Sequence, residues 1–129
     1  MIGILLVTHE NLGASLARCA EHILGAMPSQ LASIAVLSGD DAVLVEQRAR
    51  LMLRSLDQGD GVLVFTDIVG ATPYNATIRL MEPGHIEGLA GVNLPMLMRA
   101  LTYRNTALAD VLEKASSGAI AGIVRVPPC

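Results

Sequence analysis

Short apolar runs alternate along the chain with longer segments in which apolar residues recur every three or four positions. A continuous apolar run, such as residues 2–7, is typical of a strand that is buried on both faces. The wider spacing, as at Leu12, Leu16 and Ala20, is typical of an amphipathic helix. On this pattern, strands are predicted at 2–7, 32–37, 62–66, 86–91 and 119–126.

Start and stop signals mark the helices predicted between these strands. Thr72 and Pro73 provide a cap followed by proline at the first helical position. Asn93 can begin the next helix, and Thr106 can cap the one after it. Gly118 is the expected stop of that last helix. The predicted order of elements is therefore β-α-β-α-β-α-β-α-α-β.

This order predicts one α/β domain that spans residues 1–129 without a linker. The alternation favours a doubly wound, mostly parallel sheet with helices on both faces. A strand order of 2-1-3-4 would place the first and third strands side by side. The last strand candidate, 119–126, is expected at a sheet edge, where it could pair within the subunit or with a partner subunit.

Composition narrows the classes of function. Apolar residues make up 52% of the 129 residues and charged residues 16%, which fits a chain with a real core. The nine Lys and Arg residues are scattered, the net charge is −3 and aromatic residues are scarce, so no nucleic-acid partner is expected. No apolar stretch approaches the roughly 18 residues of a membrane span, and no signal peptide is apparent. We therefore expect a cytoplasmic protein.

The two cysteines, Cys19 and Cys129, lack the spacing of a zinc site or a redox motif, which fits a reducing compartment. Cys19 lies in an apolar helical pattern and is expected in the core, whereas Cys129 is expected on a loose tail. The sequence contains no Walker-type loop, no Gly-x-Gly-x-x-Gly and no cluster with metal-ligand spacing. No cofactor and no metal are expected.

Polar residues follow the first and third predicted strands, at the ends where open parallel sheets bind ligands. They are His9, Asp67, and the loop residues Gly70, Ala71 and Thr72. If the two strands are neighbours, His9 and Asp67 come within hydrogen-bonding distance. A neutral imidazole is nucleophilic toward phosphorus near neutral pH, and a carboxylate on its other nitrogen selects the tautomer and stabilises developing positive charge. The loop N–H groups and the Thr72 hydroxyl could then bind the phosphoryl oxygens.

Each of these features, taken alone, has a simpler structural explanation. A histidine at a strand end is more often a surface residue than a nucleophile, and an aspartate there is a common turn residue. Thr72 with Pro73 is an ordinary helix start. The other two histidines, His22 and His85, are expected as solvated surface residues. The functional hypothesis rests on the convergence of three features at one edge of the sheet.

Four longer stretches carry a further resemblance: IGILLVTH (2–9), AEHILG (20–25), GVLVFTDIVGATPYN (61–75) and GVNLPMLMRAL (91–101). In order and spacing they resemble the enzyme IIA domain of the mannose family of the bacterial phosphoenolpyruvate:sugar phosphotransferase system. The resemblance implies that His9 is the phosphoacceptor and that Asp67 is the carboxylate bonded to it. It implies that Gly70, Ala71 and Thr72 hold the phosphate. It also implies the histidine phosphocarrier protein HPr as donor, an enzyme IIB as acceptor, and a homodimer that can exchange its C-terminal strand.

Two departures from that family affect the expected function. Many members have glycine after the histidine, whereas this chain has Glu10, whose side chain we expect to point to solvent. We expect a IIA domain without an attached IIB domain, so that sugar transport would need separate IIB and membrane subunits, and contact with the membrane would be indirect. An alternative is a stand-alone regulatory binding module whose partner affinity is switched by phosphorylation of His9. A small α/β hydrolase is disfavoured because Gly-x-Ser-x-Gly is absent.

Overall fold

A computed structural model describes residues 1–129 of the chain. Its strands are β1 (Gly3–His9), β2 (Leu31–Val36), β3 (Val62–Thr66) and β4 (Ile86–Ala90). Its helices are α1 (Leu12–Leu24), α2 (Ala42–Leu56), α3 (Thr72–Ile78), α4 (Leu94–Tyr103) and α5 (Leu108–Ala121). The strands and helices alternate up to α4, as the hydrophobic pattern predicts.

The strands form one four-stranded parallel sheet in the order β2-β1-β3-β4, which confirms the predicted order. β1 lies between β2 and β3, so that Val7 is opposite Ile34 on one side and Thr66 on the other. Because all neighbours are parallel, the carboxyl ends of β1 and β3 share one edge of the sheet. His9 is the last residue of β1 and Asp67 directly follows β3, which brings the two residues to that edge.

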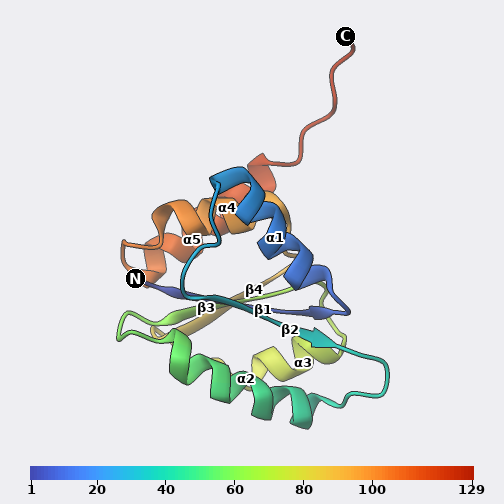
Figure 1. The fold of residues 1–129 in the computed structure, drawn as a ribbon, viewed down its shortest axis with the longest axis vertical. Helices are drawn as coiled ribbons and strands as arrows, with labels where there is room; N and C mark the ends of the chain where they lie inside the picture. The colour runs from blue at the N-terminus through green and yellow to red at the C-terminus, as the bar shows by residue number, and fades with distance from the viewer.

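Helices cover both faces of the sheet (Figure 1): α1, α4 and α5 lie on one face, and α2 and α3 lie on the other. Successive residues of β1 alternate between the two resulting cores. Ile4 and Leu6 pack with α1, α4 and α5, whereas Leu5 and Val7 pack with α2 and α3. Burial on both faces explains why β1 has a continuous apolar sequence. β1 is therefore buried from Gly3 to Thr8, the residue before His9, and His9 is its first exposed residue.

The structure does not contain the predicted C-terminal strand at 119–126. Gly118 does not stop α5, which continues to Ala121. A Cβ atom at Gly118 would lie 2.8 Å from the Cβ of Arg99, so glycine there permits the close approach of α4 and α5 rather than a helix end. The residues after α5 pair with no strand and extend away from the domain (Figure 1). Cys129 lies on this exposed tail, as expected.

Cys19 is exposed, so the prediction that it belongs to the core is wrong. The buried residues of α1 are small, namely Gly13, Ala17 and Ala20. A Cβ atom at Gly13 would lie 3.0 Å from the Cβ of Leu6, which shows how closely α1 approaches the sheet. This close packing selects small residues for the buried face of α1 and leaves Cys19 outside it.

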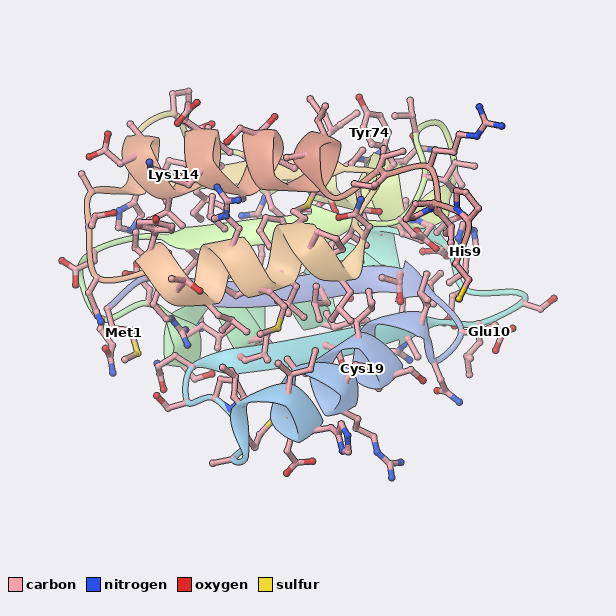
Figure 2. The ribbon with its side chains drawn as sticks, turned by 90° about the horizontal axis from the view of Figure 1, so that it is seen from above. Met1, His9, Glu10, Cys19, Tyr74 and Lys114 are labelled. Carbon is pink, nitrogen blue, oxygen red and sulfur yellow. The ribbon has the colours of Figure 1, made fainter.

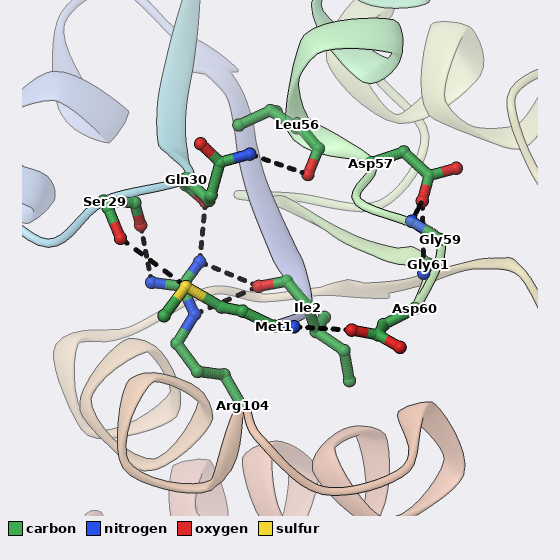
Figure 3. A network of polar contacts seen from close by, with 10 residues as sticks. All are labelled: Met1, Ile2, Ser29, Gln30, Leu56, Asp57, Gly59, Asp60, Gly61 and Arg104. Carbon is green, nitrogen blue, oxygen red and sulfur yellow. Dashed lines mark hydrogen bonds and ion pairs between the residues drawn. The ribbon is translucent and has the colours of Figure 1, made fainter.

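Arg104 is buried at the amino end of the sheet, at the end of α4 (Figure 3). Its guanidinium donates hydrogen bonds to the backbone oxygens of Ile2, Ser29 and Gln30, with distances from 2.6 to 3.0 Å. No carboxylate pairs with it, and burial lowers the pKa of the guanidinium. These bonds join the start of β1 to the loop before β2. Nothing in the sequence pattern had identified Arg104.

Candidate functional site

His9 and Asp67 meet at the carboxyl ends of β1 and β3, as predicted. His9 Nδ1 lies 2.9 Å from Asp67 Oδ2, and the backbone N–H of His9 donates to the same oxygen at 3.0 Å. The other carboxylate oxygen, Oδ1, accepts a hydrogen bond from the N–H of Ile68 at 3.1 Å. An ionised carboxylate can only accept hydrogen bonds, so the pairing favours the imidazole tautomer with its proton on Nδ1. The free lone pair of the ring is then on Nε2.

The two side chains of the pair differ in exposure. The relative accessibility of the His9 side chain is 47%, and that of the Asp67 side chain is 11%. Partial burial raises the pKa of Asp67, but the hydrogen bonds from the backbone and the ring of His9 outweigh this effect and hold the pKa below its ordinary value of 3.8. Asp67 is therefore ionised at neutral pH. The pair combines an exposed imidazole with a shielded carboxylate that orients it.

The loop Gly70, Ala71 and Thr72 follows Asp67 and leads into α3. Gly70 has φ 87°, in the left-handed region that glycine adopts without strain. The N–H groups of these three residues donate to no acceptor within the protein. Figure 2 shows Tyr74, in the first turn of α3, at the same end of the molecule as His9. The loop therefore presents unsatisfied hydrogen-bond donors at the edge that carries the His9–Asp67 pair.

Glu10 has φ 50° and is one of two non-glycine residues in the left-handed region. Its N–H donates to the carbonyl of Val36 at 3.0 Å, which continues the β1–β2 pairing by one residue. Its side chain is exposed at the end of the molecule, as expected (Figure 2). The backbone conformation at this position is one that glycine adopts readily. The departure from glycine therefore affects the backbone as well as the local charge.

The other histidines differ from each other. His22 is exposed on α1, as predicted. His85 is not a free surface residue, which corrects the prediction: its Nε2 lies 2.5 Å from Asp57 Oδ2. Asp57 Oδ1 accepts hydrogen bonds from the N–H groups of Gly59 and Gly61. The pair links the loop before β3 to the loop before β4. Its two residues are 28 positions apart and belong to no common sequence motif, so the sequence alone does not reveal the contact.

The sequence comparisons point to one family. The family model described as "PTS system fructose IIA component" matches residues 3–116. The chain is 33% identical over 105 residues to the PTS system mannose-specific EIIAB component of Escherichia coli (strain K12), covering 81% of this chain and 32% of that protein. It is 29% identical over 115 residues to the PTS system fructose-specific EIIA component of Bacillus subtilis (strain 168), covering 88% of this chain and 78% of that protein. The chain thus spans about a third of the length of the EIIAB components that it matches.

Solved structures agree with these relatives. The phosphotransferase system component EIIA from Streptococcus agalactiae is 28% identical, with a TM-score of 0.86 over 97% of each chain. The mannose/sorbose specific IIA subunit from Enterococcus faecalis is 16% identical, with a TM-score of 0.87 over 99% of this chain and 96% of that chain, a likeness of fold alone. None of the helices has the length and apolar character needed to cross a bilayer. No group of three or more His, Cys, Asp or Glu side chains is arranged to hold a metal ion.

Proposed function

Because the chain belongs to the enzyme IIA components of the mannose family of the sugar phosphotransferase system, we propose that it is a cytoplasmic phosphocarrier that accepts a phosphoryl group on His9. The family supports a phosphocarrier role in sugar phosphotransfer. The observation that carries the assignment to His9 is its 2.9 Å contact with Asp67, through Nδ1, on an otherwise exposed ring. Of the three histidines, only His9 combines exposure with a carboxylate partner at the carboxyl edge of the sheet.

The proposed step is an in-line transfer between two nitrogens. The lone pair on His9 Nε2 attacks the phosphorus of phosphohistidine on the donor, HPr. The new N–P bond forms at Nε2 while the donor's N–P bond breaks, and its electron pair returns to the donor imidazole. The proton on Nδ1 stays in place, where the Asp67 carboxylate stabilises the positive charge that develops on the ring. In the transfer to an enzyme IIB, His9 is the donor: the N–P bond at Nε2 breaks as the IIB protein's acceptor group attacks the phosphorus, and the electron pair of that bond returns to the His9 ring.

The phosphoryl oxygens need hydrogen-bond donors, and we assign this role to the loop Gly70, Ala71 and Thr72. Its three unsatisfied N–H groups and the Thr72 hydroxyl are suited to bind an anion without a charged side chain. The left-handed conformation of Gly70 leaves open space where a side chain would otherwise lie. Donors that are already in place need little reorganisation during transfer.

Phosphorylation of His9 is tested by incubating the protein with labelled phosphoenolpyruvate, enzyme I and HPr. We expect incorporation of about one phosphoryl group per chain, labile in acid and stable in base, which is typical of phosphohistidine. His9→Ala should abolish the label. His22→Ala, which removes an exposed histidine without a partner, should keep it. Label that persists in His9→Ala, or that is absent from the wild type, would refute the proposal.

The second half of the proposal is transfer from His9 to an enzyme IIB. The assay mixes purified phospho-protein with candidate IIB proteins from the same genome and follows the label. Movement of the label to one IIB supports a transport role and identifies the sugar system. Retention of the label on His9 in the presence of every candidate contradicts this half and favours the regulatory binding module.

We also propose that two copies associate through their C-terminal segments. Apolar side chains at the end of α5 and on the tail are largely exposed, namely Ile120, Ile123, Val124 and Val126. β4 is an edge strand, with β3 as its sole neighbour in the sheet. If the tail of each copy paired with β4 of the other copy, the association would cover these apolar side chains and the exposed edge of β4. Analytical ultracentrifugation should show a dimer for the full chain and a monomer after deletion of residues 123–129.

A further inference from the structure

Thr8 directly precedes His9 and is fully buried, at 0% exposure. Its Oγ1 accepts a hydrogen bond from the N–H of Gly13, at 2.8 Å. Gly13 is the second residue of α1, and Asn11, at the capping position of that helix, makes no capping bond with its side chain. Thr8 therefore provides from β1 the acceptor that the first turn of α1 would otherwise lack.

This bond closes the short loop that connects His9 to α1. Two further bonds hold the same segment: the N–H of His9 donates to Asp67 Oδ2, and the N–H of Glu10 donates to the carbonyl of Val36. The bond between Thr8 and Gly13 holds this loop at the point where it enters α1. The packing around this bond is tight, because a Cβ atom at Gly13 would lie 3.2 Å from the Thr8 hydroxyl oxygen.

We propose that Thr8 is a positioning residue for His9, holding the start of α1 so that the backbone and ring of His9 both reach Asp67. Both contacts of His9 converge on one oxygen, at 3.0 and 2.9 Å, so both depend on where the His9 backbone is held. A loosened loop lowers the fraction of molecules in which Nδ1 is protonated and Nε2 is ready to react. The predicted effect on transfer rests on the proposed function, whereas the effect on the imidazole tautomer does not.

Thr66 is a matched control for Thr8. It precedes Asp67 as Thr8 precedes His9, it is 1% exposed, and its Oγ1 is the one buried side-chain polar atom without a hydrogen-bond partner. Substitution by valine removes a buried hydroxyl and keeps the side-chain shape at either position. Only at Thr8 does it leave a buried backbone N–H, that of Gly13, without its acceptor.

The test compares wild type, Thr8→Val, Thr8→Ser and Thr66→Val. Nitrogen-15 NMR of the unphosphorylated protein reports the tautomer of His9, and the rate of phosphorylation by phospho-HPr reports its reactivity. In Thr8→Val we expect a mixture of tautomers and a kcat lowered about 10-fold, with KM for phospho-HPr unchanged, because the donor surface is intact. Thr8→Ser, which keeps the hydroxyl, and Thr66→Val should both resemble the wild type.

Three results would overturn the proposal. The first is a Thr8→Val protein that melts earlier but keeps the wild-type tautomer and kcat, since Thr8 would then serve stability alone. The second is an equal loss in Thr66→Val. The third is a Thr8→Ser protein, folded and with its hydroxyl retained, that loses the tautomer; this variant decides the matter if Thr8→Val does not fold. If the wild type itself is not phosphorylated, the proposed function fails, and the NMR comparison still tests Thr8.

Discussion

The two ends of the sheet each carry a histidine paired with an aspartate, and the pairs differ in what else the aspartate binds. At the carboxyl end, Asp67 uses one oxygen for both the ring and the backbone N–H of His9. At the amino end, Asp57 uses one oxygen for the ring of His85 and the other for two glycine N–H groups. Figure 2 shows the distance between these regions, with His9 at one end of the molecule and Met1 at the other.

The comparison shows that a histidine–aspartate contact is not in itself a sign of chemistry. What distinguishes the carboxyl end is the state of the neighbouring backbone. The N–H groups of Gly70, Ala71 and Thr72 have no acceptor in the protein, whereas those of Gly59 and Gly61 are bound to Asp57. One end therefore leaves its donors unsatisfied, which fits the proposed binding of a phosphoryl group, and the other uses its donors to hold the chain together.

The sharpest test removes the negative charge from each aspartate in turn. In Asp67→Asn the amide no longer stabilises positive charge on His9, and the rate of phosphorylation by phospho-HPr should fall on the order of 10³-fold. Asp57→Asn should leave that rate within about twofold, because its partner, His85, lies at the other end of the sheet. Rapid-quench measurement on folded samples of both variants makes the comparison. Equal losses in the two variants would contradict the assignment of chemistry to one end.

The next effect concerns the amino end alone. Arg104→Met would leave the carbonyls of Ile2, Ser29 and Gln30 without their donors, and we expect the free energy of unfolding to fall by about 2–4 kcal/mol. Arg54→Met is the control, since Arg54 is exposed on α2 and makes no ion pair; it should change stability by less than about 0.5 kcal/mol. Urea titration measures both variants. A loss below about 1 kcal/mol for Arg104→Met would show that its hydrogen bonds only offset the burial of its charge.

Arg104 also marks the limit of what the sequence predicts. The strand order and the meeting of His9 with Asp67 were predictable, because local apolar runs and the rules of parallel sheets determine both. Arg104 binds backbone carbonyls 74 to 102 positions away, which leave no pattern in the sequence. Cys19 was misassigned because the face of α1 that packs on the sheet is formed by the small residues Gly13, Ala17 and Ala20, and Cys19 lies off that face. The last strand, predicted from residue 119, does not form within the subunit, because Gly118 serves helix packing instead of helix termination and α5 continues to Ala121.

A smaller effect distinguishes the amino-end pair by pH. The hydrogen bond from the N–H of Gly59 has the largest effect on the pKa of Asp57 and lowers it, whereas burial raises it. Hydrogen bonds from His85 and Gly61 lower the pKa further, so that it lies below its ordinary value of 3.8. A carboxyl with a lowered folded-state pKa contributes stability above the unfolded value, and this contribution disappears as the pH falls through the folded value. Asp57→Asn should therefore reduce stability by about 1–2 kcal/mol at pH 7 and by less below pH ~4. Urea titrations across pH 3–7 check this; a pH-independent difference would contradict it.

The smallest predicted effect compares the two non-glycine residues in the left-handed region, one at each end of the sheet. Glu10, beside His9, has φ 50°, and Gln30, before β2, has φ 51°. Glu10→Gly relieves a strained backbone and removes no side-chain hydrogen bond. We expect it to raise the free energy of unfolding by at most about 0.5–1 kcal/mol, because the greater conformational entropy of glycine in the unfolded chain offsets part of the gain. Gln30→Gly relieves the same strain but loses the bonds from Nε2 to the carbonyls of Ser55 and Leu56, so it should lower stability. Thermal melts should therefore show a higher melting temperature for Glu10→Gly and a lower one for Gln30→Gly. Shifts of the same sign would contradict the contrast between the two ends of the sheet.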